Sequence, residues 1–271
     1  MDIVCVGDVG IDLYLPDESR HLGGITANVA QHLAMHLPPE DSISVISALG
    51  NDVNGQDVRG QLDTRRIDWR LREYEGRTPV QTIEVDAHGE RHFTHYEAGV
   101  LPDLEFDTDD TACIAKADLL VAPVFSQVVS MFERLMAIST RGQVAVDFSD
   151  FSLSPDFALL ERHLAGIHIA FFGMNPSDSE NLRKLRALAK ASDTLFIITL
   201  GGAGSMSVSA RHDVLVDAVP VATVVDTTGA GDAYAAGFLS EYIYCGDVQA
   251  AMRQGANVAA AVVQSIGAVP K

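Results

Sequence analysis

Short apolar runs alternate with stretches of helical periodicity along most of the chain. The apolar runs lie at residues 3–6, 44–48, 119–122, 144–146, 167–172 and 195–200, and several contain Val, Ile and Leu without alternation. Apolar residues recur at helical spacing over residues 26–36, 53–64, 130–141, 179–191, 232–244 and 247–265. Unbroken apolar strands are typical of a parallel sheet that helices cover on both faces. The alternation therefore predicts a doubly wound α/β fold with right-handed crossovers.

The segment between residues 80 and 96 departs from this pattern. Residues 80–85 (VQTIEV) and 91–96 (RHFTHY) alternate as half-buried strands do, and a loop containing Gly89 separates them. Two such runs around a short loop predict a β-hairpin. We expect this hairpin to join residues 12–15 in a small separate sheet, so that residues 12–16 and 78–97 form a lid on a single domain spanning residues 1–271. An edge hairpin of the main sheet is the alternative.

Composition and charge exclude several classes of protein. The 271 residues are 47% hydrophobic and 21% charged, which fits a globular chain with a sizeable core and argues against disorder. The net charge of −18 leaves no basic surface for nucleic acid or an anionic membrane. The widely spaced Cys5, Cys113 and Cys245 suggest neither a disulfide framework nor a zinc site. With no apolar run near ~18 residues and no basic N-terminal region, we expect a cytoplasmic protein without a membrane partner.

The heptad DTTGAGD at residues 226–232 carries the sharpest chemical signal, because a helical run follows it directly. Glycines at a helix start let backbone N–H groups converge on an anion, and the helix dipole adds positive potential there. Asp232 stands where its carboxylate can accept a proton from a hydroxyl that attacks a phosphorus held by this loop. Such an arrangement predicts phosphoryl transfer. The alternative is that Asp232 only caps the helix.

Taken with a second motif, the heptad resembles the PfkB-type carbohydrate kinases, the ribokinase family. The second motif is the segment GGITAN at residues 23–28, and the resemblance extends to GDVGID at 7–12, LGND at 49–52 and TLGGAGS at 199–205. It implies a ribokinase-like fold, with a mostly parallel doubly wound sheet and a small β lid, and ATP-dependent phosphorylation of a hydroxyl group. A dinucleotide-binding enzyme is set aside, because no G-x-G-x-x-G follows the first strand.

The resemblance also implies roles for residues on the acceptor side. Asp232 would be the catalytic base, and the anion hole would be formed by Gly229, Ala230 and Gly231. The hydroxyls of the acceptor would be held by Asp12, Gly23, Gly24 and Asn28. Carboxylates and amides bind vicinal hydroxyls, and paired glycines let a substrate approach the backbone, so the residue types fit these roles. A plain turn at Gly23 and Gly24 and a local cap at Asn28 are the alternatives.

For the nucleotide and the ions, the resemblance implies a further set of contacts. Thr199, Gly201 and Gly204 would form the ATP loop, and Asn257 would lie beside the adenine; an ordinary turn and a solvated helix position are the alternatives. Magnesium and the phosphates would be ordered by Asn175 together with an acid acting through water, either Asp178 or Glu180. A monovalent cation such as K⁺ would bind near Asp226.

Two segments favour a particular acceptor. Residues 96–100 (YEAGV) and 146–150 (VDFSD) most resemble the fructoselysine kinase group. Asp147 and Asp150 add acids without a nearby Arg, which suits an acceptor bearing an ammonium group. We therefore expect fructoselysine or a related fructosamine as the acceptor, with Asp150 in its site. A cap of the next loop is the alternative role for both acids.

Other functions remain open at this point. They are a kinase for fructose, ribose or a nucleoside, and a sugar-binding regulator that has lost catalysis. A keto-deoxy sugar acid is disfavoured, because we can place no Arg to bind its carboxylate. We also expect the lid to pair with a second subunit as a homodimer.

Overall fold

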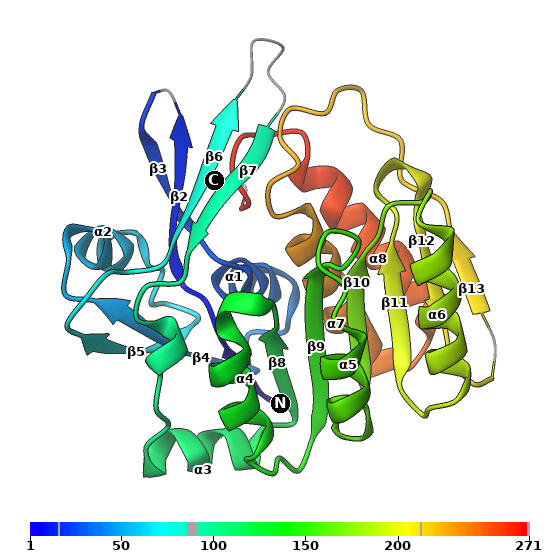
Figure 1. The fold of residues 1–271 in the computed structure, drawn as a ribbon, viewed down its shortest axis with the longest axis horizontal. Coiled ribbons are helices and arrows are strands. Elements are labelled where there is room, and N and C mark those ends of the chain that lie inside the picture. Colours follow the sequence, from blue (N-terminus) through cyan, green and yellow to red (C-terminus); the bar gives the residue numbers. More distant parts are fainter. Residues whose placement is uncertain (16, 86–90, 212, 270–271) are drawn as a thin grey trace.

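The computed structural model describes residues 1–15, 17–85, 91–211 and 213–269. In this part of the chain the main sheet has nine strands in the order β13-β12-β11-β10-β9-β8-β1-β4-β5 (Figure 1). All neighbouring strands from β11 to β5 are parallel, whereas β12 is antiparallel to both of its neighbours. The strands are β1 (Asp2–Val6), β4 (Ser42–Gly50), β5 (Asp68–Tyr74), β8 (Leu119–Pro123), β9 (Gln143–Asp150), β10 (Ile169–Gly173), β11 (Leu195–Thr199), β12 (Ser205–Val208) and β13 (Asp213–Val216).

Helices cover both faces of this sheet (Figure 1). They are α1 (Ile25–His36), α2 (Val53–Gln61), α3 (Thr108–Lys116), α4 (Val129–Met136), α5 (Phe157–His163), α6 (Ser179–Lys190), α7 (Ala230–Cys245) and α8 (Val248–Val262). On one face, α4, α5 and α6 pack Phe132, Leu160 and Leu185 into a buried cluster with the strands. On the other face, α1, α7 and α8 contribute to a second cluster. The predicted doubly wound, mostly parallel α/β fold is confirmed.

A second, four-stranded sheet stands over the carboxyl ends of the main strands (Figure 1). Its order is β3-β2-β6-β7, with bounds Ser19–Gly23, Gly10–Leu15, Val80–Val85 and Arg91–Glu97. The two strands of the predicted hairpin pair with each other, and β6 also pairs with β2. The hairpin is therefore not an edge of the main sheet. Its loop, residues 86–90, lies outside the described residues.

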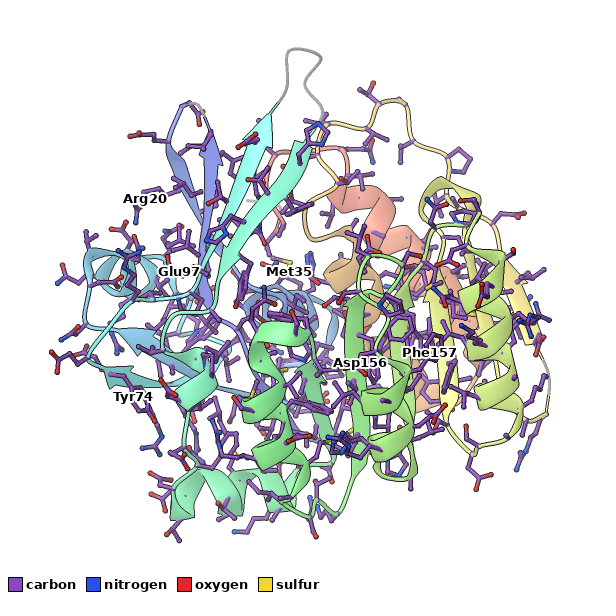
Figure 2. All side chains as sticks on the ribbon, in the orientation of Figure 1. Arg20, Met35, Tyr74, Glu97, Asp156 and Phe157 are labelled. Carbon is purple, nitrogen blue, oxygen red and sulfur yellow. The ribbon has the colours of Figure 1, made fainter. Side chains whose placement is uncertain are left out.

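Several elements were not predicted, and each has a weak local pattern. The helix α3 has the sequence TDDTACIAK, in which acids crowd the first turn, and it is started by a capping box at Asp107. The edge strands β5 and β3 carry charged or polar residues that mask alternation, and β12 and β13 have only four residues each. The short α5 begins after Asp156, whose carboxylate accepts the Leu159 N–H at 2.9 Å (Figure 2). In the described part of the chain, no helix is both long and apolar enough to span a membrane.

Candidate functional site

Four buried or half-buried carboxyl groups meet beneath the second sheet, although they come from distant parts of the chain. Asp8 follows β1, Asp12 lies in β2, Asp147 lies in β9 and Asp232 lies in the first turn of α7. Burial raises the pKa of Asp232 well above its ordinary value, and the negative charges of Asp147, Asp8 and Asp12 raise it further. Burial, with Asp8 and Asp226, likewise raises the pKa of Asp12 to about 7. The fold therefore concentrates negative charge at one point.

Asn28 holds the Asp232 carboxylate in place. The Asn28 side-chain N–H donates to Asp232 Oδ2 at 2.8 Å, from a residue that is itself only 3% exposed. This contact joins α1 to α7, so Asn28 does not act as a local cap. Asp232 is not the cap of α7 either, because the helix begins after Gly229, which has a left-handed backbone and makes no side-chain cap. Both side chains are thus left to face the site.

Gly23 and Gly24 are required by close packing rather than by the turn alone. A Cβ at Gly23 would lie 2.2 Å from Oδ1 of Asp12, and a Cβ at Gly24 would lie 2.5 Å from the carbonyl oxygen of Asp8. Gly24 also has a φ of 104°, which disfavours other residues. The Asp8 carboxylate accepts the Ile25 N–H at 3.0 Å, at the start of α1. The two glycines therefore let the backbone lie directly against the acids of the site.

The glycine loop before α7 leaves part of the helix N-terminus open. Gly229 packs so tightly that a Cβ would lie 2.4 Å from Cβ of Ala268, whereas a Cβ at Gly231 would meet nothing within 4 Å. The Ala230 N–H donates to the Thr227 carbonyl at 3.2 Å and is engaged in the turn. The first N–H groups of a helix lack partners within it. Gly231 is therefore the member of the predicted anion hole that faces open space.

Tyr14 ties the second sheet to this loop. Its hydroxyl lies 3.0 Å from Oδ2 of Asp226 and 3.1 Å from Oγ1 of Thr228, and all three residues are buried. Asp226 also accepts the N–H groups of Thr228 and Gly267, both at 2.9 Å. The Asp226 carboxylate is therefore engaged by three protein donors. Sequence reasoning missed Tyr14, because a tyrosine on a half-buried strand gives no signal of a contact made 212 residues away.

Asp147, rather than Asp150, belongs to the cluster of acids. The β9 strand extends four residues beyond the predicted 144–146, to Asp150. Asp147 accepts the Ser149 N–H at 2.7 Å, and burial and the charge of Asp8 raise its pKa to about 6. Asp150 is exposed, and its carboxylate accepts the Leu153 N–H at 3.3 Å in the next turn. Both acids thus accept a local backbone N–H, as in the capping alternative, but Asp147 is the one whose charge acts on Asp232.

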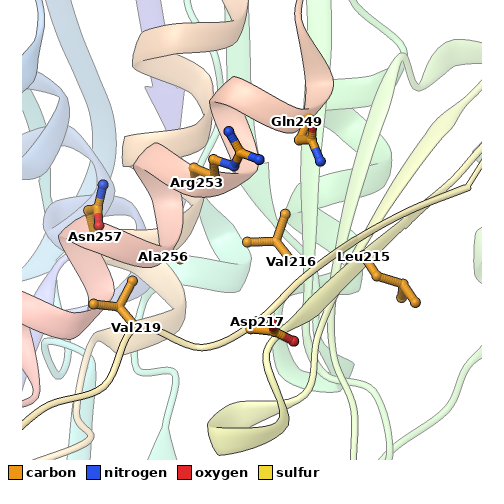
Figure 3. A pocket seen from close by; sticks show the side chains of 8 residues that line it. All are labelled: Leu215, Val216, Asp217, Val219, Gln249, Arg253, Ala256 and Asn257. Atoms are coloured by element: carbon orange, nitrogen blue, oxygen red, sulfur yellow. The ribbon is translucent and has the colours of Figure 1, made fainter.

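A pocket of about 380 Å³ lies beside α8, toward the edge of the main sheet (Figure 3). Apolar side chains of β13 and the next segment form one wall, and a polar stripe of α8 forms the other; the lining residues are Leu215, Val216, Asp217, Val219, Gln249, Arg253, Ala256 and Asn257. Gly204, with φ 91°, brings the turn after β11 against this wall, since its Cβ would lie 2.3 Å from the Val216 carbonyl oxygen. The predicted adenine contact, Asn257, thus lines a pocket.

The other residues predicted for the nucleotide lie in a turn between strands. Thr199 ends β11, and its hydroxyl donates to the Phe172 carbonyl at 3.4 Å. Gly201, with φ 56°, is exposed, and a Cβ there would meet nothing within 4 Å. The segment connects β11 to β12 through a tight turn, and its glycines give it the backbone conformation it needs.

The residues predicted to order magnesium are engaged with their neighbours. Asn175 Oδ1 accepts the Ser177 N–H at 2.9 Å, and Asp178 caps α6 by accepting the Asn181 N–H at 3.2 Å. Hydrogen bonds from Asn181 lower the pKa of Asp178, and the Lys184 ammonium, 2.8 Å away, lowers the pKa of the exposed Glu180. Among the described residues, no group of three or more His, Cys, Asp or Glu side chains could hold a metal ion.

Comparison with known proteins gives consistent matches over the whole chain. The family described as pfkB family carbohydrate kinase matches residues 1–271. The fructosamine kinase FrlD of Bacillus subtilis (strain 168) is 30% identical over 273 residues, covering 99% of this chain and 93% of that protein. The fructoselysine 6-kinase of Shigella flexneri is 30% identical over 269 residues, 98% of each chain. The structure of Arabidopsis thaliana ribokinase complexed with ribose and ATP superposes with a TM-score of 0.76 at 18% identity, covering 98% and 93%.

Proposed function

Because the chain belongs to the pfkB family of carbohydrate kinases and is an ATP-dependent sugar kinase, we propose that its acceptor is a fructosamine, a sugar that carries an amine substituent. The observation that supports this acceptor is the cluster formed by Asp8, Asp12, Asp147 and Asp232. In the part of the chain that the structure describes, no Lys or Arg is among the charges that shift the pKa values of these four groups. A positive charge is therefore what the cluster lacks.

An ammonium group on the acceptor would supply that charge. An opposite charge within about 4–6 Å of a carboxyl group favours its ionised form, whereas the cluster alone disfavours it. Asp147 is the acid we assign to the ammonium, because its charge acts on Asp232 while Asp150 caps a turn outside the cluster. Two relatives that carry fructosamine or fructoselysine in their names support the same acceptor class.

In the proposed reaction, Asp232 accepts the proton of the attacking hydroxyl. A general base works best with a pKa near the working pH, and burial among like charges raises the pKa of Asp232 in that direction. Asn28 fixes the orientation of the carboxylate through its 2.8 Å hydrogen bond. The open N–H of Gly231 and the N-terminus of α7 would stabilise charge on the transferred phosphoryl group. Asp12 would bind hydroxyls of the acceptor against Gly23.

On the nucleotide side, we assign the adenine to the pocket beside α8. The apolar wall at Val216 and Val219 would pack against the base, and Asn257 offers an amide to its polar edge. Gly201 and Gly204 would let the turn after β11 approach the phosphates. Magnesium supplies neutralising charge when bound with ATP, and the ionised Asp178 beside Asn175 fits a contact to it through water better than Glu180, which pairs with Lys184.

The second sheet is the lid in this proposal. Closing over the acids, it would exclude water and so limit hydrolysis of ATP. Phe93, 56% exposed on β7, is a candidate contact for a second copy of the chain. A monovalent cation near Asp226 would share a carboxylate that accepts hydrogen bonds from Tyr14, Thr228 and Gly267, and no step of the proposed reaction depends on it. We propose that the protein acts in the cytoplasm.

The test is ADP formation from ATP and Mg²⁺ with fructoselysine, a second fructosamine, fructose, ribose and adenosine. We expect the fructosamines to give the highest kcat/KM. Asp147→Asn should raise KM for them on the order of 10-fold while changing KM for fructose little. Asp150→Asn is the matched control and should leave both KM values unchanged. If only fructose, ribose or adenosine is phosphorylated, the protein is still a kinase but its acceptor is not a fructosamine. If a sugar binds and no acceptor is phosphorylated, the protein is a sugar-binding regulator that has lost catalysis.

A further inference from the structure

The Tyr96 hydroxyl is buried in the second sheet without a hydrogen-bond partner among the described residues. Tyr96 lies near the end of β7, next to the strand β6. Its ring packs edge-on against Phe125, with ring centroids 5.0 Å apart and an interplanar angle of 87°. Phe125 follows β8 of the main sheet. A contact across the two sheets therefore fixes the ring, and with it the position of the hydroxyl.

The surroundings of the hydroxyl place it at the acceptor side of the site. Burial and then the charges of Asp8 and Asp12 raise the pKa of Tyr96 well above its ordinary value. Neither carboxylate is within hydrogen-bond distance, since the structure leaves the hydroxyl unpaired. In the second sheet, Tyr96 pairs with Gln81, and Gln81 pairs with Asp12, so Tyr96 and Asp12 lie in register two strands apart. Because residues in register on neighbouring strands share a face of the sheet, the Tyr96 side chain lies on the same face as Asp12, the acid that we assign to the hydroxyls of the acceptor.

A second unpaired atom belongs to the same site. Asn28 donates its side-chain N–H to Asp232, but its Oδ1 atom is buried without a partner in the described part of the chain. Buried polar atoms in folded proteins are nearly always paired, and leaving one unpaired destabilises the protein. Here one unpaired group can donate a hydrogen bond and the other can only accept one. A ligand rich in hydroxyl groups satisfies both.

We propose that Tyr96 is a substrate-binding residue, whose hydroxyl donates a hydrogen bond to an oxygen of the acceptor sugar on the side that Asp12 holds. This inference rests on the proposed function as a sugar kinase, but not on the amine of the acceptor. It makes the second sheet part of the acceptor site rather than only a cover. Because its hydroxyl is not hydrogen-bonded to Asp232, whereas the Asn28 side chain is, Tyr96 binds the acceptor and does not take part in proton transfer.

The test is Tyr96→Phe, which keeps the ring against Phe125 and removes only the hydroxyl. We expect KM for the acceptor, and its Kd by calorimetry, to rise on the order of 10-fold, as for the loss of one hydrogen bond. The kcat and the KM for ATP should stay unchanged. The Tm of the free protein should not fall, because an unpaired buried hydroxyl is removed. Tyr74→Phe is the control; its hydroxyl accepts the Glu105 N–H at 3.1 Å, away from the site.

Two kinds of result would overturn the assignment. An unchanged KM for the acceptor in Tyr96→Phe would remove Tyr96 from the site, whatever the acceptor is. A lower Tm with equal rises in both KM values would indicate a structural role instead. The KM of the variant is measured with whichever sugar the wild type phosphorylates best. A result that rejects fructosamines as the acceptor therefore does not affect this test of Tyr96. A wild-type protein that binds none of the sugars would overturn both this inference and the proposed function.

Discussion

The acceptor side and the nucleotide side of the site are built in opposite ways. On the acceptor side, Asp12, Asn28 and Asp232 are buried, and Asn28 reaches across to a residue 204 positions away. On the nucleotide side, Asn175 and Asn257 are exposed, and the Asn175 side chain contacts a residue two positions away. One half is assembled by the tertiary fold, and the other consists of local turns and a helix face around an open pocket.

This difference indicates that the acceptor side contributes more to catalysis than the nucleotide side does. Carboxyl groups buried together raise one another's pKa values, which destabilises the empty site and favours a ligand that brings donors or positive charge. A preorganised polar site needs no rearrangement when charge develops in the transition state. The exposed nucleotide side has no comparable group of buried, like-charged side chains among the residues assigned to it. We therefore expect mutations to have large effects on the acceptor side and small effects on the nucleotide side.

The largest effect is expected for Asp232→Asn, which keeps the shape of the side chain and removes the base. General-base catalysis contributes about 10²–10⁴ to the rate, so kcat should fall by about 10³. The acceptor should still bind, because Asn28 and Asp12 remain. The free protein should gain stability, since a buried carboxyl group among like charges is lost. Turnover, calorimetry and thermal unfolding measure the three effects. A kcat within tenfold of the wild type would contradict the role of Asp232.

Gly23→Ala is expected to have the next largest effect. Its Cβ would lie 2.2 Å from Asp12 Oδ1, so the carboxylate must move out of its position. Because misplacing a positioning group by about 1 Å can cost on the order of 10²-fold in rate, kcat/KM for the acceptor should fall by about that factor. KM for ATP should change little.

Gly60→Ala is the matched control for this substitution. A Cβ at Gly60 would meet nothing within 4 Å, and Gly60 lies in α2, where alanine favours the helix. That variant should retain full activity and gain stability. Equal losses of activity in the two variants would show that the close packing at Gly23 does not matter.

The sequence predicts this contrast only in part. The unbroken apolar runs identify the central strands, and the heptad at residues 226–232 identifies the loop before α7, because each is a local pattern. The pairing of β2 with β6 and the contacts of Tyr14 and Tyr96 depend on where the second sheet stands. The choice between Asp147 and Asp150 depends on how β9 ends. Such features follow from tertiary packing, and neither the periodicity of apolar residues nor the spacing of motifs in a single sequence predicts them.

The acceptor side also predicts a pH dependence of stability. The pKa of Asp12 is about 7 in the folded protein, against an ordinary value of 3.8. The folded state therefore holds this proton more tightly than the unfolded state does. Asp12 consequently lowers the free energy of unfolding as the pH rises from about 4 to about 7, and its effect is constant above that range.

Asp12→Asn should remove this contribution. The variant should exceed the wild type in free energy of unfolding by an amount that grows up to pH 7, reaching about 1.4 kcal/mol or more there. Urea unfolding at pH 5, 6, 7 and 8 measures the difference, in which the titration of His32 and His36 cancels. Gln264→Ala, which removes no titratable group, is the control and should show no such trend. A difference that is flat across the four pH values would argue against a protonated Asp12.

The smallest effect is expected for Asn257→Ala on the nucleotide side. Asn257 is exposed on α8, so its amide exchanges a hydrogen bond with water for one with the base, and the net gain is small. KM for ATP should rise about 3- to 5-fold with kcat unchanged, and alanine should not weaken the helix. Gln264→Ala, an exposed amide just beyond α8 that does not line the pocket, should leave KM for ATP unaltered. A 100-fold rise for Asn257→Ala would mean that the nucleotide side is preorganised too, and the contrast between the two halves would fail.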